Sequence, residues 1–453
     1  MVSNLLKQVR NLHHLEAAWR SVRSNGLASK SDVVRKDIQK FEEDPTRNLR
    51  SLQSRLVRGS FKFSPARGVP IPKPGRNDIR PIVLADVETR IVQRAILDVL
   101  QNIDELKPFF LNPNSFGGIK KRQDQPVSAV PAAIKAVLDA IGAGARHIVC
   151  ADISAFFTRI QKSTVSDIVS SAVDDEEFMD LFRRAIHVEL SNLTELREKA
   201  HRFPTEDLGV AQGSALSPLL GNIILADFDK QMNEGDCRCI RYIDDFVVLG
   251  PSAAAVMARV RLAKGILGAL GMSFALDKTS PNAIPVTVGF EFLGIEINNG
   301  LIRPSSKART KFLTSLRTTF NQGRDALNGY RNGQPLPKSN ALLGTLKKVD
   351  GIIQGWGKHY HFCNDKRCFE NLDQEISKLI RDHLAFYSGE HRKAPADRKA
   401  ALLGVEMLSA LERTPFEWPK VNAACPSHAA AEESRRTASA TLGERSRKAA
   451  NLR

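Results

Sequence analysis

The sequence is poor in aromatic residues and cysteine and has no long apolar run. Aromatic residues make up 6% of the 453 positions, and there are six cysteines. No stretch of 18 apolar residues occurs, and the N-terminal twenty residues lack the apolar centre of a secretory signal. The Cys237-x-Cys239 and Cys363-x4-Cys368 pairs have no second half at zinc-finger spacing. We therefore expect a cytoplasmic protein with reduced cysteines and no membrane partner.

Charge is abundant but unevenly distributed. The chain has 66 Lys and Arg against 50 Asp and Glu, which gives a net charge of +16. Residues 1–80 carry +10, residues 81–300 carry −6 and residues 301–420 carry +9. Basic surfaces attract polyanions such as nucleic acid, and an acidic centre can collect carboxylates for metal ions. A basic protein without either function is the alternative that charge alone leaves open.

Apolar periodicity predicts an α+β region followed by an all-α module. We expect a helix at 86–101 that begins after Asp86, a single helix at 216–232 and a hairpin at 239–250. Further expected features are helices at 31–56 broken at Pro45, an extended pair at 60–75 with a turn at Pro74-Gly75, and strands at 288–304 joined at Asn299-Gly300. From 305 to 388 the pattern is helical, and the last ~30 residues are expected to be disordered.

Three aspartates stand out against apolar surroundings. Asp152 ends a short apolar strand, and Asp244 and Asp245 occupy the centre of the expected hairpin. Burial of like charges is costly unless a cation offsets it, and carboxylate oxygens are the ligands that Mg²⁺ prefers. Two such ions about 4 Å apart can activate a hydroxyl and stabilise a leaving pyrophosphate. An exposed turn carrying two aspartates is the alternative.

Seven segments in consecutive order resemble those of reverse transcriptases of the bacterial group II intron type. Tyr242 to Asp245 resembles the Y-x-D-D box of that family, and Asp152 resembles its first metal-binding aspartate. The other similar segments are 70–97, 115–124, 209–229, 290–297 and 343–380. The resemblance implies an α+β right-hand polymerase fold with fingers, a palm with an antiparallel sheet, and an all-α maturase-type thumb.

The resemblance also implies domain borders and a metal set. It places an N-terminal helical segment at 1–60, fingers at 61–145, a palm at 146–304, a thumb at 305–388 and a C-terminal extension at 389–453. Asp152, Asp244 and Asp245 would hold two Mg²⁺ ions, for which Mn²⁺ can substitute. These three residues are the expected catalytic centre, with Lys278 as a general acid toward pyrophosphate. An exposed loop lysine is the alternative for Lys278.

Further residues are expected around an incoming dNTP. Cationic side chains suit the triphosphate, a glycine lets the backbone approach the nucleotide, and a bulky ring can exclude a 2′-hydroxyl. The positions that match the family are Lys73, Arg80, Phe157, Gln212, Gly213 and Tyr242. The alternatives are a solvated basic loop for Lys73 and Arg80, a loop at the start of a helix for Gln212-Gly213, and a place in the core for Phe157.

The expected contacts with nucleic acid lie in the thumb. Lys347 and Lys348 would meet phosphates, and Trp356 would line a template–primer groove, although a place in the thumb core is an alternative for Trp356. Only ~65 residues follow position 388, without the Cys and His clusters of an HNH nuclease. This pattern is similar to stand-alone reverse transcriptases associated with phage defence.

We therefore expect an RNA-directed DNA polymerase. Its partners would be an RNA template, such as a noncoding RNA, together with dNTPs and a DNA product; an oligomer is compatible with the sequence. The alternatives are template-independent or protein-primed DNA synthesis on the same fold, and a non-catalytic RNA-binding maturase.

Overall fold

The computed structural model describes residues 4–73, 78–118, 129–204 and 206–418. By compactness the chain divides into two units, Met1–Thr318 with Gly351–Arg381 and Thr319–Asp350 with Asp382–Arg453. The expected borders of fingers, palm and thumb stay predictions. The predicted turn at Pro74-Gly75, the end of the 115–124 segment and the last ~30 residues lie outside the described residues. Among the described helices, none is both long and apolar enough to cross a membrane.

Four helices and a hairpin begin the first unit. They are α1 (Leu5–Val9), α2 (Leu12–Leu27), α3 (Asp32–Glu42), α4 (Pro45–Val57), β1 (Arg67–Pro72) and β2 (Ile79–Leu84), followed by α5 (Val87–Leu100). The predicted break at Pro45 is confirmed, since Pro45 is the first residue of α4 and Asp44 caps it. The predicted cap of α5 is also confirmed, because the Asp86 side chain accepts a hydrogen bond from the Thr89 N–H.

The main sheet of the first unit has five strands in the order β3-β5-β6-β4-β7. These are β3 (Ser115–Phe116), β5 (Arg238–Tyr242), β6 (Asp245–Gly250), β4 (His147–Asp152) and β7 (Ile284–Pro285). All pairings are antiparallel except that of β3 with β5. The expected α+β class and the 239–250 hairpin are confirmed.

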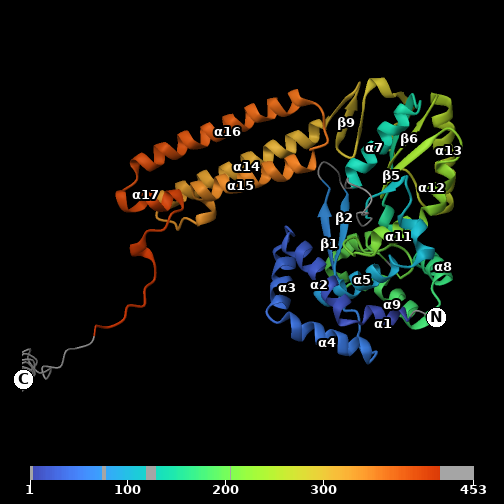
Figure 1. Cartoon of the computed structure of the whole chain (residues 1–453), viewed down its shortest axis with the longest axis horizontal. Coiled ribbons are helices and arrows are strands. Elements are labelled where there is room, and N and C mark those ends of the chain that lie inside the picture. Colours follow the sequence, from blue (N-terminus) through green and yellow to red (C-terminus); the bar gives the residue numbers. More distant parts are fainter. Residues whose placement is uncertain (1–3, 74–77, 119–128, 205, 419–453) are drawn as a thin grey trace, which may run out of the picture. The chain divides into compact units, whose positions relative to one another are not determined.

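Both faces of this sheet are covered, which explains the nearly continuous apolar sequence of β4 and β6. Helices α11 (Ser217–Ile224), α12 (Ala226–Met232) and α13 (Ala253–Ala269) pack with one face, and α7 (Ala129–Gly142) packs on the other (Figure 1). Residues alternate between the two cores, with Val149, Ala151, Phe246 and Val248 in the first and Ile148, Ile240, Val247 and Leu249 in the second. The sheet therefore forms a frame fixed from both sides.

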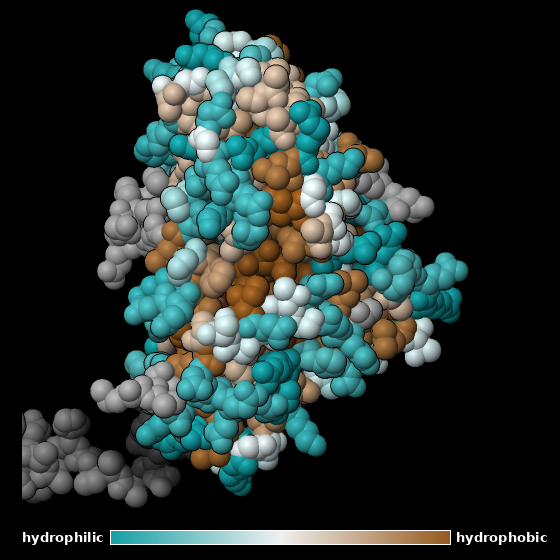
Figure 2. Space-filling view, turned by 90° about the vertical axis from the view of Figure 1, so that its right-hand side faces the viewer, coloured by the Kyte–Doolittle hydropathy of each residue, from teal (hydrophilic) through white to brown (hydrophobic). Residues whose placement is uncertain are grey.

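Four further α-helices precede β8 in the described part of the first unit. They are α6 (Lys107–Phe110), α8 (Lys162–Ala172), α9 (Glu176–Ile186) and α10 (Leu193–Leu196). Figure 2 views the side of the molecule that carries α13, where apolar side chains gather in a strip and hydrophilic residues surround it. The surrounding polar surface agrees with the 26% of charged residues in the sequence.

Two sequence predictions were too simple. The single helix expected at 216–232 is divided at Leu225 into α11 and α12. The region 288–304 forms three strands, β8 (Phe290–Phe292), β9 (Ile295–Asn298) and β10 (Leu301–Pro304), because Leu293 and Gly294 adopt positive φ and add a turn. The predicted turn at Asn299-Gly300 is confirmed.

In the described residues from 305 to 418, the helical pattern forms four α-helices. They are α14 (Ser306–Arg331), α15 (Leu342–His359), α16 (Lys366–Lys393) and α17 (Ala396–Leu403). The first three each contribute residues to both units. In the second unit, Leu327, Leu342, Tyr387 and Leu402 form a small apolar core.

A buried histidine lies in the second unit. His383 is fully buried, and neither of its ring nitrogens has a hydrogen-bond partner among the described residues. Its ring centroid is 5.0 Å from that of Phe320. Burial, with a smaller contribution from the charge of Arg324, lowers the pKa of His383 to about 4. The histidine is therefore neutral in the folded protein.

We predict that acid destabilises the second unit through His383. The unfolded chain takes up the proton near pH 6.5 and the folded chain only near pH 4. The free energy of unfolding should thus fall by about 3 kcal/mol as the pH drops from 6.5 to 4, and this histidine should make no pH-dependent contribution above that range. Urea unfolding of wild type and His383→Leu, followed by circular dichroism at several pH values, measures this. A stability difference between the two proteins that is independent of pH would contradict it.

Candidate metal centre and adjoining cavity

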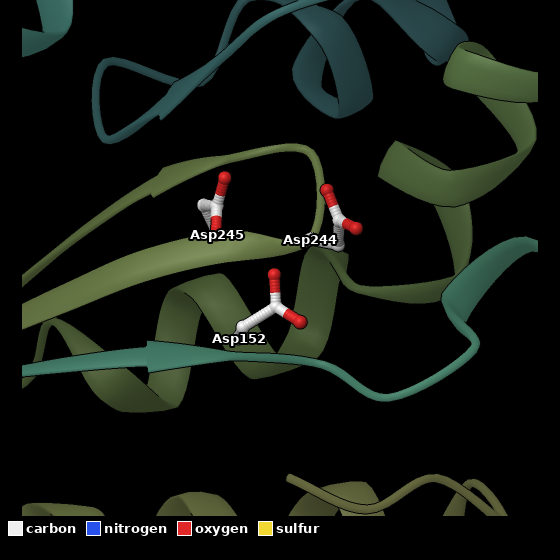
Figure 3. A group of neighbouring side chains, drawn as sticks. All are labelled: Asp152, Asp244 and Asp245. Atoms are coloured by element: carbon white, nitrogen blue, oxygen red, sulfur yellow. The ribbon is translucent and has the colours of Figure 1, made fainter. Parts of the chain in front are cut away.

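Three aspartates meet where β4 ends and β6 begins. Asp152 is the last residue of β4 and lies opposite Asp245, the first residue of β6, while Asp244 occupies the β5–β6 turn. One carboxylate oxygen from each lies within 4.8 Å of the other two. Figure 3 shows the three side chains gathered at this junction. The antiparallel register thus joins residues that are more than 90 positions apart in the sequence.

The turn that carries Asp244 is tight and strained. Tyr242 pairs directly with Asp245, which leaves Ile243 and Asp244 as a two-residue loop. Ile243 has a φ of +61°, a left-handed conformation that normally favours Gly, Asn or Asp and costs other residues about 1–2 kcal/mol. The Ile243 N–H donates to the Phe116 carbonyl over 3.2 Å, and the Asp244 carbonyl accepts from the Ile153 N–H over 3.0 Å. Surrounding contacts therefore hold the turn.

The carboxylates repel one another in a poorly solvated place. Burial, a hydrogen bond with Asp152 and the charges of Asp244 and Asp152 raise the pKa of Asp245 to about 8. Burial and then the charge of Asp152 raise the pKa of Asp244, against smaller opposing effects of Lys278 and Arg80. The arrangement favours any bound cation.

Lys278 supplies such a cation from the protein itself. Its Nζ atom lies 2.7 Å from both carboxylate oxygens of Asp152, whose side chain is only 7% exposed. The loop that carries Lys278 is tied to β4, because the Ala275 N–H donates to the Asp152 carbonyl over 2.8 Å. The predicted catalytic lysine therefore lies beside the predicted metal ligands.

A cavity of about 600 Å³ adjoins the carboxylates. The predicted site residues that line it are Lys73, Arg80, Asp152, Phe157, Gln212, Gly213, Asp244 and Lys278. Tyr242 and Asp245 do not line the cavity. The half-buried Tyr242 belongs to the hairpin, so its contact with a nucleotide stays a prediction. The structure thus gathers eight residues that the sequence spreads over two hundred positions.

The loop at Gln212-Gly213 requires a glycine. Gly213 has a φ of +124°, and a Cβ atom there would come within 3.0 Å of the Val83 carbonyl oxygen. The Gln212 carbonyl accepts from the Val83 N–H over 3.0 Å, and the Ser214 hydroxyl donates to Gln93 over 3.0 Å. The loop is therefore fixed to β2 and α5.

The basic side of the cavity is larger than the sequence motifs indicated. Arg159, His201 and Arg202 also line it, in addition to Lys73 and Arg80. The Lys73 amine is 2.6 Å from Asp78, which is also 3.8 Å from Arg202. Lys73 is the main cause of a lowered pKa at Asp78. Arg159 follows Asp152 by seven positions, but neither it nor the 201–202 pair belongs to a motif that would single it out.

The predicted thumb residues are divided between the two units. Trp356 is half-buried in the first unit, 4.4 Å from the Phe312 ring and 4.5 Å from the Tyr360 ring, measured between centroids. Lys347 and Lys348 lie on the part of α15 that belongs to the second unit, and both are exposed. The Lys348 amine donates to Asn340 over 2.7 Å. Their role in binding nucleic acid stays a prediction.

The three carboxylates fit hard divalent cations. Their oxygens are close enough to share ions, they are oxygen donors only, and their mutual repulsion is relieved by positive charge. Asp152, Asp244 and Asp245 are the residues that would hold such ions. Among the described residues, no other group of three or more acidic, histidine or cysteine side chains comes together in this way.

We predict that Asp245→Asn stabilises the metal-free protein. The folded state binds a proton at Asp245 up to about pH 8, whereas an unfolded aspartate releases it near pH 3.8, so this group reduces stability as the pH rises between these values. Replacing it should raise the free energy of unfolding at pH 7 and increase the melting temperature by a few degrees. Thermal melting without Mn²⁺ measures this gain. Melting with Mn²⁺ measures how much less the ion stabilises the variant than the wild type.

The exposed Asp236 precedes the same hairpin, and Asp236→Asn serves as the matched control. A melting temperature of Asp245→Asn at or below that of wild type would contradict the predicted relief of repulsion.

Comparison with known proteins identifies relatives of this chain. YkfC of Escherichia coli K12 is 28% identical over 299 residues, covering 57% of this chain and 72% of that protein. The group II intron-encoded protein LtrA of Lactococcus lactis is 26% identical over 216 residues, covering 47% of this chain and 32% of LtrA. The chain therefore spans most of YkfC but about a third of LtrA.

Comparison with solved structures gives weaker likenesses. Apo telomerase from Candida tropicalis has a TM-score of 0.41 at 13% identity, covering 76% of this chain and 64% of that one. A Cas6-RT-Cas1–Cas2 complex has a TM-score of 0.33 at 18% identity, covering 59% of this chain and 43% of the other. Scores at this level add nothing to the assignment.

A family model settles the assignment. The model described as reverse transcriptase (RNA-dependent DNA polymerase) matches residues 71–297, which is half of the chain and contains the three aspartates and the cavity-lining residues named above. The relatives agree with the resemblance of the sequence motifs to the group II intron type. The chain belongs to the reverse transcriptase family, in its bacterial group II intron-like branch.

Proposed function

We propose that this protein extends a DNA primer on an RNA template, with dNTPs as substrates and two Mg²⁺ ions as cofactors. The observation that carries the proposal is the cluster of three carboxylates next to a cavity that is also lined by several basic residues. Bound divalent cations would supply activation of the primer hydroxyl and neutralisation of charge on the leaving pyrophosphate. The chain itself must bind and orient the two reacting groups.

The basic residues of the cavity suit the triphosphate. Arg80 is exposed and lines the cavity, and it is close enough to Asp244 for its charge to lower the pKa of that carboxyl. Lys73 lines the same cavity from the same end of the hairpin formed by β1 and β2, where Ile71 pairs with Arg80. Arginine can bind phosphate oxygens in a bidentate manner, while lysine acts as a compact charge. We assign both to the incoming triphosphate.

Lys278 is suited to protonate the leaving pyrophosphate. Lys278 lines the cavity beside Asp152 and its side chain is 44% exposed, so the amine can turn from the carboxylate toward a phosphate. A protonated amine within reach of the leaving oxygen can transfer its proton as the bond breaks. The alternative role is a purely electrostatic one at Asp152.

The finer parts of the proposal concern the template and the biological role. We propose a noncoding RNA as template and antiphage defence as role, supported by the resemblance to stand-alone bacterial reverse transcriptases. Lys347, Lys348 and Trp356 are the thumb residues that we assign to nucleic acid, supported by the exposure of the two lysines. Sequencing of the RNA that co-purifies with the protein identifies the template.

We predict that primer extension on a homopolymer RNA template requires the aspartate pair. The double variant Asp244→Ala, Asp245→Ala should lose activity by about 10³-fold or more, because the charge that holds the cations is gone. Extension rates with Mg²⁺, compared with those of the Asp236→Asn control, measure this.

Extension without any template would favour the template-independent alternative. RNA binding without extension by the wild type would favour the non-catalytic maturase. A folded double variant that extends the primer at a nearly normal rate would contradict the assignment of the site.

We predict that Phe157 excludes ribonucleotides. Its half-buried ring lines the cavity five positions after Asp152, so Phe157→Val should admit a 2′-hydroxyl and keep dNTP incorporation. The ratio of kcat/KM for dNTP over rNTP should fall by at least tenfold. Phe178→Leu, a core substitution outside the cavity lining, is the control. An unchanged ratio in Phe157→Val would assign the exclusion of ribonucleotides to another residue.

A further inference from the structure

An arginine lies completely buried directly before the aspartate turn. Arg241 has an exposed fraction of 0%, and its partner Asp229 on α12 has 3%. The guanidinium binds this carboxylate in a bidentate manner, with Nε 2.7 Å from Oδ1 and Nη2 2.5 Å from Oδ2. Such a pair fixes the orientation of the guanidinium plane.

The same guanidinium reaches the strained turn. Its Nη1 atom donates to the carbonyl oxygen of Ile243 over 2.9 Å, while Nη2 also donates to Asn222 on α11 over 3.2 Å. Asp229 accepts a further hydrogen bond from Asn112 over 3.3 Å. Arg241 therefore connects the left-handed residue of the turn to two helices beneath the sheet.

The turn needs such a connection. Ile243 is β-branched and has a φ of +61°, a conformation that the isolated chain would leave. The hydrogen bond from Arg241 holds the carbonyl that immediately precedes Asp244. Rotation of that peptide would displace the Asp244 carboxylate, and then the Asp245 carboxylate, relative to Asp152.

A role in stability alone explains this pair poorly. Replacing a buried ion pair by apolar residues of similar size is often neutral or stabilising, because removal of two charges from water is expensive. The specific feature of Arg241 is its geometry, since one planar group satisfies a carboxylate, an amide and the turn carbonyl at once.

We propose that Arg241, held by Asp229, is a positioning residue that sets the spacing of the metal-binding carboxylates through the Ile243 carbonyl. It touches neither the carboxylates of the metal centre nor the cavity. The changes in kcat and KM that test this inference can be measured only if the proposed polymerase function is correct, so in this respect the inference rests on that function.

Two variants test the role without leaving a lone buried charge. Arg241→Lys keeps a cation beside Asp229, but a single amine cannot hold both that carboxylate and the turn carbonyl. The double variant Arg241→Met, Asp229→Leu removes both charges and keeps the volume filled. Val256→Ala is the control for lost stability, because Val256 is buried beside Gly250, at the opposite end of β6 from Asp245.

We expect both variants to lower kcat by 10- to 100-fold, as misplacement of catalytic groups by about 1 Å does. The KM for dNTP should stay within about twofold, because the phosphate-binding residues are untouched. Binding of Mn²⁺ to the protein without nucleotide, followed by electron paramagnetic resonance, should weaken at least fivefold. Val256→Ala should lower the melting temperature and leave kcat and Mn²⁺ binding unchanged.

A third substitution tests the path through the turn. Ile243→Asn places a residue that tolerates the left-handed conformation in the turn, so Arg241→Lys should cost less kcat in that background than in wild type. Equal losses in both backgrounds would overturn the proposed path. Unchanged kcat and Mn²⁺ binding in both Arg241 variants would overturn the positioning role.

The two hypotheses fail in different ways. A wild-type protein that binds Mn²⁺ and extends no primer would refute the polymerase function, while the Mn²⁺ affinities of the Arg241 variants would still decide the positioning role.

Discussion

Mutual repulsion of three carboxylates is the constraint on which the rest of the structure depends. Asp152, Asp244 and Asp245 lie within reach of one common ion, in a place where burial raises the pKa of Asp244 and of Asp245. The β4–β6 register, the tight turn and the amine of Lys278 are what hold them together. The carboxylate cluster is thus a locally unfavourable arrangement that the surrounding fold offsets.

The sheet provides the rigidity that this arrangement needs. Pairing of β4 with β6 sets Asp152 directly opposite Asp245, and a slip by one residue would turn every side chain of β6 to the other core. Because both faces of the sheet are packed, such a slip would not expose apolar side chains to water. It would instead disrupt the packing of both apolar cores. The catalytic register therefore has the same physical basis as the stability of the sheet.

Much of the site could be predicted from the sequence because its parts are local. The Asp-Asp pair in an apolar hairpin, the cap at Asp86 and the turn at Asn299-Gly300 each depend on neighbouring residues. The division at Leu225 was missed because apolar periodicity continues through it. The turn at Leu293-Gly294 was missed because the apolar run on both sides reads as one strand. Arg159 and Arg202 were missed because only the folded chain brings them to the cavity.

The buried pair of Arg241 and Asp229 has a consequence for how this protein can change over generations. Loss of either charge alone leaves the other uncompensated in the interior, which typically costs about 3–5 kcal/mol, a large part of the stability of a domain. Single substitutions at these sites would therefore be eliminated before a second could follow. The two positions should be replaced only together, so lineages that differ at one should differ at both.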